Sequence, residues 1–103
     1  MKKTYNKLVR DKIPEIIEAS GKRFKIEILN DEEYIKAIDQ KFDEELCEYR
    51  KDQNLEELAD LLEVIYAATK ARGYSIEDLE KLRATKHDER GGFEKRIFLK
   101  EVD

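Results

Sequence analysis

The chain has 103 residues, of which 45% are charged and 40% hydrophobic, and its formal net charge is −4 at pH 7. A chain of this length forms one domain with a modest core, so we expect a single domain over residues 1–103. The acidic balance argues against binding to a nucleic-acid polymer, whose phosphates attract basic surfaces. No apolar run approaches the roughly twenty residues that cross a bilayer, and the first residues lack the apolar stretch of a secretory signal, so we expect no membrane partner. The single cysteine, Cys47, cannot form an internal disulfide, which favours a cytoplasmic protein.

The first third of the chain is predicted to contain a short helix and a strand. Pro14 suits the first turn of a helix, and Ser20-Gly21 marks its end, so we expect a helix from about Ile13 to Ala19. Hydrophobic and charged residues then alternate over residues 24–28, which is the pattern of a half-buried strand. This short strand requires a partner from elsewhere in the chain.

Two longer helices are predicted next. Asn30-Asp31 supplies an N-cap, and the helix that follows should run to about Lys51. A polar turn at residues 52–54 is short, so the next helix, from about Leu55 to Arg72, is expected to return antiparallel to the first.

The last third is predicted to add one helix and one strand. Ser75 is an N-cap with Asp78 three residues later, close to a capping box. The apolar run Ile97-Phe98-Leu99 is the expected partner of the first strand. The predicted fold is therefore mainly α, an antiparallel helix pair or bundle with a small two-stranded antiparallel β element from residues 24–28 and 93–99.

Two pairs of carboxylates occur at the same spacing on the two long helices. The pairs are Glu45 with Glu48, and Glu57 with Asp60. Residues three apart lie on the same side of a helix, so each pair can direct two carboxylates toward one point. Both pairs fall on apolar arcs of their helices, where a carboxylate must be paired, protonated or bound to metal. Antiparallel packing of the helices would bring the four carboxylates together.

A cluster of carboxylates repels itself, and a divalent cation would relieve that cost. Mg²⁺ takes oxygen ligands and keeps positions open for substrate phosphates and water, so Mg²⁺ is the expected cofactor, with Mn²⁺ as a second candidate. Such an ion polarises a phosphoryl group and activates water. The competing interpretation is that the acidic pairs are ordinary solvated faces of highly charged helices.

Two stretches resemble a known superfamily. Glu-Glu-Leu-Cys-Glu at residues 44–48, followed by Glu-Leu-Ala-Asp at residues 57–60, resembles the EExxE…ExxD motif of the all-α nucleoside triphosphate pyrophosphohydrolases. That superfamily includes MazG, dimeric dUTPases and dCTPases, and phosphoribosyl-ATP pyrophosphohydrolase. The segment YNKLVRDKIPEII at residues 5–17 is similar to the start of small MazG-like proteins. The resemblance covers most of the chain, but the larger core of full-length MazG is missing, which leaves the nucleobase pocket undefined.

The resemblance implies a Mg²⁺-dependent hydrolase that cuts between the α- and β-phosphates of a nucleotide, releasing a monophosphate and pyrophosphate. It implies a MazG-like all-α fold that assembles as a homodimer or homotetramer. The matching metal-binding positions are Glu45, Glu48, Glu57 and Asp60. Either Glu44 or one of these ligands, such as Glu45, would orient or deprotonate the attacking water.

Basic residues near both ends of the chain are candidates for binding the substrate phosphates. They are Lys7, Arg10, Lys12, Lys81, Arg83, Lys86 and Arg90. An ordinary solvated basic surface is the alternative for each group. The substrate is expected to be a nucleoside triphosphate in a house-cleaning role, with phosphoribosyl-ATP of histidine synthesis as a second hypothesis. A non-catalytic helical dimerisation or regulatory module is the hypothesis of a different class.

Overall fold

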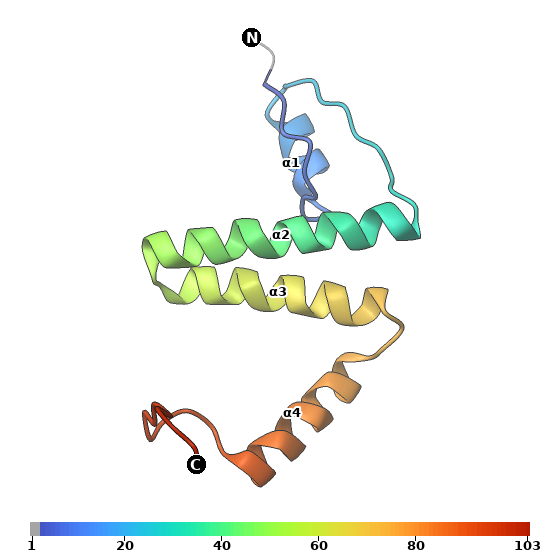
Figure 1. The fold of residues 1–103 in the computed structure, drawn as a ribbon. Helices are drawn as coiled ribbons and strands as arrows, with labels where there is room; N and C mark the ends of the chain where they lie inside the picture. The colour runs from blue at the N-terminus through green and yellow to red at the C-terminus, as the bar shows by residue number, and fades with distance from the viewer. Residues whose placement is uncertain (1–2) are drawn as a thin grey trace.

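Four α-helices make up the described part of the chain, residues 3–103, in a computed structural model (Figure 1). In chain order they are α1 (Ile13–Ala19), α2 (Asp31–Asp52), α3 (Leu55–Ala71) and α4 (Ile76–Arg90). The mainly α prediction is confirmed. The first three helices begin and end within about two residues of their predicted bounds, and the fourth begins directly after the predicted N-cap Ser75.

The antiparallel pair of α2 and α3 is the centre of the fold, and its ends are set by local capping. The Asn30 side chain accepts a hydrogen bond from the Glu33 N–H at 2.9 Å, and the Glu33 carboxylate accepts one from the Asn30 N–H at 3.2 Å. Asn54 caps α3 by accepting from the Glu57 N–H at 3.0 Å. Gln53 supplies the left-handed residue of the turn, with φ of 49°. This turn is only two residues long, so the two helices return side by side (Figure 1).

The core lies between α2 and α3. Ile38 of α2 is 2% exposed and Val64 of α3 is 7% exposed, and these are the only buried hydrophobic side chains among the described residues. Because apolar burial is the main favourable term in folding, a core this thin stabilises a single chain weakly. Much of the remaining apolar surface is exposed to solvent.

The helix α4 begins beside the end of α3 and then diverges from it (Figure 1). Gly73, with φ of +88°, turns the chain after α3. The Ser75 side chain accepts from the Asp78 N–H at 3.0 Å, and the Asp78 carboxylate accepts from the Ser75 N–H at 2.9 Å, so the expected capping box is present. The chain is elongated, with principal extents of 60 × 31 × 25 Å.

The predicted two-stranded β element is not formed. Neither residues 24–28 nor residues 93–99 are strands in the part of the chain that the structure describes. The first segment lies on the α2 side of the helix pair and the second on the α3 side, so the pair separates them (Figure 1). A turn also interrupts the second segment, since Arg96 has φ of 58° and its N–H donates to the Phe93 carbonyl at 3.1 Å. The alternating pattern of residues 24–28 is a local signal only, because residues 93–99, the predicted partner strand, are out of reach within one chain.

Among residues 3–103, each helix is either too short or too polar to cross a membrane.

Candidate metal centre

Three carboxylates from two helices converge beside the turn that joins α2 and α3. Glu45 comes from the second half of α2, and Glu57 and Asp60 come from the first two turns of α3. One carboxylate oxygen from each of the three lies within 4.8 Å of the others. All three side chains are half-buried. Three of the four carboxylates predicted as metal ligands therefore lie together, and the fourth, Glu48, is not part of this group.

A second group of carboxylates adjoins the first. It consists of Glu48, Asp52 and Glu57, again with one oxygen each within 4.8 Å. Glu57 belongs to both groups, while Glu48 belongs only to the second. Asp52 was not predicted, although its position four residues after Glu48 in the last turn of α2 placed it on the same side of that helix.

The dimensions of the first group fit a hard divalent cation. Ligand oxygens about 2.1 Å from Mg²⁺ lie roughly 3 to 4 Å from one another in an octahedral site. The three oxygens, within 4.8 Å of one another, are close to that range of separations. The donors are carboxylate oxygens throughout, which suits Mg²⁺ or Mn²⁺ better than metals that prefer nitrogen or sulfur.

The convergence of the carboxylates disfavours the ionised form of Glu57. Desolvation raises the pKa of its carboxyl, and the nearby negative charges of Asp60, Asp52, Glu48 and Glu45 raise it further. A raised carboxyl pKa means that the folded chain disfavours the ionised form. A cation bound between these groups would reverse that effect.

Glu44 is held by lysines and does not belong to either carboxylate group. Lys7 donates to one carboxylate oxygen at 2.7 Å and Lys41 to the other at 3.2 Å. Desolvation raises the pKa of Glu44, but the hydrogen bonds from Lys7 and Lys41 outweigh it, so the pKa lies below its usual value. The hydrogen bond to Glu44 in turn raises the pKa of Lys7.

Lys41 is a residue of this site that the sequence interpretation missed. Its ammonium also lies 3.4 Å from Glu45, and its side chain is only 16% exposed. It therefore neutralises two adjacent carboxylates from within α2. The signal was available, since Lys41 precedes Glu44 and Glu45 by three and four residues, the spacing of intrahelical ion pairs.

Replacing Lys41 is expected to destabilise the metal-free protein. Lys41→Met keeps the length of the stem but leaves Glu44 and Glu45 with less positive charge, which should cost about 1–2 kcal/mol, between the values for exposed and buried pairs. Lys36→Met, an exposed change on the same helix, is the control. Urea denaturation measures both variants, and an equal effect of the two substitutions would mean that Lys41 has no special role.

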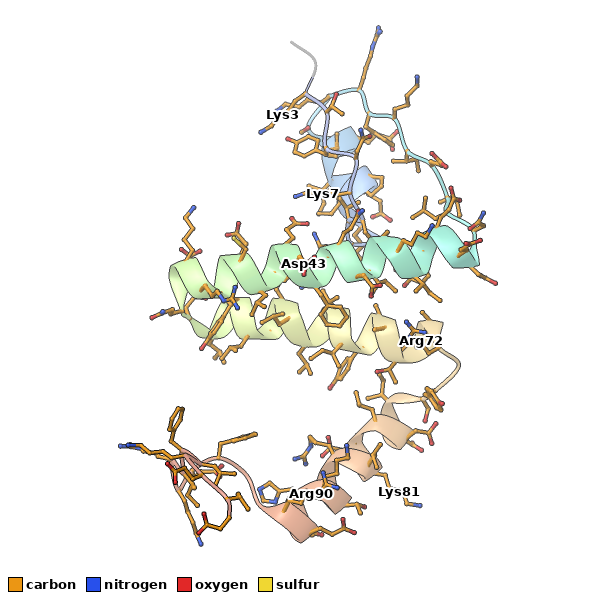
Figure 2. The ribbon with its side chains drawn as sticks, viewed as in Figure 1. Lys3, Lys7, Asp43, Arg72, Lys81 and Arg90 are labelled. Atoms are coloured by element: carbon orange, nitrogen blue, oxygen red, sulfur yellow. The ribbon has the colours of Figure 1, made fainter. Side chains whose placement is uncertain are left out.

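The basic segment of residues 5–12, here called the amino-terminal arm, lies against the carboxylates. The Arg10 guanidinium donates to Asp60 at 2.7 Å across 50 residues of sequence, and Lys7 reaches Glu44 across 37. Figure 2 shows Lys7 beside α2. The third basic residue of the arm predicted to bind phosphate, Lys12, is exposed at the N-cap position of α1. Sequence spacing could not show this docking, because it joins segments far apart in the chain.

The basic residues of α4 lie away from the carboxylates within one chain. Figure 2 shows Lys81 and Arg90 on α4, on the far side of α3 from the amino-terminal arm. Arg83 on the same helix is paired with Glu80, with 2.9 Å between its Nε and the carboxylate. The exposed Lys86 shares that helix. The structure therefore brings Lys7 and Arg10 to the carboxylates and does not bring the four α4 residues there.

Comparison with known proteins adds one relative. No family model matches the chain, and no solved structure matches it. A stretch of 43 residues, 42% of the chain, is 56% identical to a protein of Mycolicibacterium smegmatis (strain ATCC 700084 / mc(2)155) described as uncharacterized. The matched stretch spans 44% of that protein, less than half of its length. The MazG-like resemblance accordingly stays a prediction.

Proposed function

We propose that this chain is a Mg²⁺-dependent nucleotide pyrophosphohydrolase of the MazG-like all-α type. It would hydrolyse the bond between the α- and β-phosphates and release a nucleotide monophosphate and pyrophosphate. The observation that carries the proposal is the convergence of Glu45, Glu57 and Asp60 from consecutive antiparallel helices, with their oxygens within 4.8 Å. A solvated acidic face would spread its charges, whereas here they gather against a neighbouring helix.

The carboxylates of α2 and α3 would hold the metal. Glu45, Glu57 and Asp60 form the primary site, and Glu48 with Asp52 extends it on the side of Glu57. When bound, Mg²⁺ polarises the phosphoryl oxygens and lowers the pKa of an attacking water. Open coordination positions are expected because three carboxylates supply fewer ligands than the six that Mg²⁺ requires.

Glu44 is suited to orient a water molecule. Its lowered pKa keeps it ionised, so it accepts hydrogen bonds well but is a weak base. Lys7 and Lys41 hold the carboxylate from two directions and limit its movement. Between the two residues predicted to act on water, Glu44 therefore takes the orienting role, and Glu45 acts as a metal ligand.

Arg10 and Lys7 would bind the phosphates of the substrate. Arg10 donates one N–H to Asp60, and its side chain is 58% exposed, so further donors of the guanidinium remain accessible beside the carboxylates. A guanidinium in that position can bind a phosphate with two hydrogen bonds. Positive charge from the chain would then neutralise oxygens that the metal does not contact.

The proposed substrate, cellular role and oligomeric state follow from the resemblance. We propose a nucleoside triphosphate in cytoplasmic house-cleaning, with phosphoribosyl-ATP as the second candidate, and a homodimer or homotetramer as the active form. A non-catalytic helical dimerisation module is the competing function, because the exposed apolar surface of α3 and α4 would serve it equally well.

A panel of nucleotides separates these possibilities. The protein would be incubated with canonical and modified nucleoside triphosphates and phosphoribosyl-ATP, with Mg²⁺ or with a chelator, and assayed for pyrophosphate. Mg²⁺-dependent release of pyrophosphate from at least one nucleotide is expected. If no nucleotide yields pyrophosphate and Mg²⁺ leaves the melting temperature unchanged, the non-catalytic module is favoured.

A further inference from the structure

The amino-terminal arm and α1 pack only loosely against the rest of the chain. No side chain of residues 3–29 is buried, and the most enclosed apolar ones, such as Leu8 and Ile17, are half-buried. The helix α1 makes no packing contact with another helix and extends away from α2 (Figure 1). Its Ile16 side chain is 61% exposed. Apolar burial, the main favourable term in folding, therefore contributes little to holding this stretch in place.

Two ion pairs join this stretch to the helix pair. Lys7 donates to Glu44 of α2 and Arg10 donates to Asp60 of α3, each at 2.7 Å. Among the described residues these are the only hydrogen bonds between residues 3–29 and the two long helices. The Lys7 and Arg10 side chains are 41% and 58% exposed. Ion pairs at such exposed positions contribute little to stability, so the arm is docked by a weak electrostatic contact.

One of the two ion pairs uses a carboxylate of the candidate metal centre. Asp60, which accepts from Arg10, is also the residue that gathers with Glu45 and Glu57. The guanidinium therefore supplies positive charge to this group in the metal-free chain. A divalent cation carries twice that charge and approaches a carboxylate oxygen to about 2.1 Å, closer than the 2.7 Å of the ion pair. Because two cations at one carboxylate repel each other, a bound ion should replace the guanidinium.

The connection between α1 and α2 allows the arm to move. Gly21, with φ of +80°, follows α1, and residues 22–29 form no helix or strand. Eight residues of extended chain reach roughly 27 Å. The arm and α1 can therefore separate from the helix pair while α2 keeps its place.

We propose that the amino-terminal arm is a strap on the metal centre, closed by Arg10 on Asp60 and released when a divalent cation binds there. Without this contact, the pair of Lys7 with Glu44 is the only remaining ion pair between the arm and the helix pair in the described chain. The arm and α1 then swing away about residues 21–29, and the Arg10 guanidinium becomes free to bind a phosphate of the substrate. The strap rests on the proposed metal centre and adds a conformational change to it.

Distance measurement by double electron–electron resonance tests the release. Spin labels would be attached to Glu18→Cys, near the end of α1, and Lys36→Cys, on the exposed side of α2, in a Cys47→Ser background. With a chelator, the closed strap should give one narrow distance distribution. Saturating Mg²⁺, which is diamagnetic, should replace this narrow peak by a broad distribution. Both samples would be held at equal ionic strength, because salt alone weakens exposed ion pairs.

Two further variants identify the contact that closes the strap. Arg10→Gln should give the broad distribution even with a chelator, because the contact with Asp60 is lost. Arg23→Gln removes the same charge from an exposed position between α1 and α2, so it should keep the narrow peak until Mg²⁺ is added. A narrow peak from Arg10→Gln with the chelator would overturn the strap, since another contact would then hold the arm.

Mn²⁺ binding to the unlabelled Cys47→Ser protein separates failure of the strap from failure of the metal centre. If Mn²⁺ binds with saturation and Mg²⁺ leaves the narrow peak unchanged, the strap is wrong and the metal centre stands. If no ion binds and the peak stays narrow, both proposals are wrong. Saturable binding together with loss of the narrow peak is the result that the strap predicts.

Discussion

Glu57→Gln is expected to abolish Mg²⁺-dependent turnover while leaving the metal-free fold at least as stable as the wild type. Glu57 belongs to both carboxylate groups, so its loss weakens each of them. Replacing a residue that only hydrogen-bonds to a metal ligand already lowers metal affinity or activity about 10–100-fold. Losing a ligand that both groups share should therefore lower turnover at least about a hundredfold. In the absence of metal the same change removes a charge that four neighbouring carboxylates disfavour.

Glu56→Gln is the matched control for this variant. Glu56 also lies in the first turn of α3 and carries the same charge, but it is exposed and belongs to neither carboxylate group. The two variants therefore lose the same favourable interaction with the helix dipole. Thermal melting with and without Mg²⁺ should show a metal-induced rise for the wild type and Glu56→Gln, and none for Glu57→Gln. A lower metal-free melting temperature for Glu57→Gln than for Glu56→Gln would contradict the proposed repulsion.

The pH dependence of this comparison follows from the raised pKa of Glu57. A carboxyl whose pKa is raised by folding destabilises the folded state at any pH above that pKa, where the group is ionised in both states. The cost disappears as the pH falls through the ordinary glutamate pKa of about 4.3, because the group is then protonated in both states. The metal-free stability gained in Glu57→Gln should therefore be present at pH 7 and vanish near pH 4. A gain independent of pH would point to packing instead of charge.

Arg10→Gln is expected to change metal affinity and turnover in opposite directions. The Arg10 guanidinium lies on Asp60, so its positive charge repels a metal bound there. The repulsion between the guanidinium and a bound ion at such a separation in a solvated site is about 1–2 kcal/mol. Removing the guanidinium should therefore raise the affinity for Mg²⁺ roughly tenfold. Turnover should fall by about 10–100-fold, because a hydrogen bond to a charged phosphate is lost. Calorimetric titration of Mg²⁺ and steady-state kinetics measure the two effects separately.

Arg23→Gln provides the control for Arg10→Gln. Arg23 is an exposed residue between α1 and α2, and its replacement removes the same charge away from the carboxylates. It should leave both quantities unchanged. If Arg10→Gln lowers metal affinity as well as turnover, Arg10 acts by positioning Asp60 as a ligand, and its role in binding phosphate loses support.

The helices could be predicted because their signals are local. Asn30 with Glu33 and Ser75 with Asp78 are capping pairs within four residues, and the structure forms both. The convergence of Glu45, Glu57 and Asp60 could also be predicted, because a two-residue turn between capped helices leaves one simple arrangement.

Sequence reasoning missed two parts of the site. One depends on a contact between segments far apart in the chain, and the other is an ion pair that cannot be told from many similar ones in so charged a sequence. The contact between Arg10 and Asp60 spans 50 residues, and no spacing rule reports it. Lys41 was one lysine among the 21 basic residues of the chain, and only its burial beside Glu44 and Glu45 distinguishes it. The β element failed for a similar reason, because residues 24–28 and 93–99 have strand-like patterns but lie on opposite sides of the helix pair (Figure 1).

Titration of Mn²⁺ into the nucleotide-free protein, followed by the electron paramagnetic resonance signal of the free ion, tests the metal centre most directly. The wild type should bind about one or two ions per chain with saturation, and Mg²⁺ should displace them. Asp60→Asn should weaken this binding at least about tenfold, while Glu56→Gln should retain it. Absence of saturable binding, or equal binding by the wild type and Asp60→Asn, would contradict a metal centre at Glu45, Glu57 and Asp60.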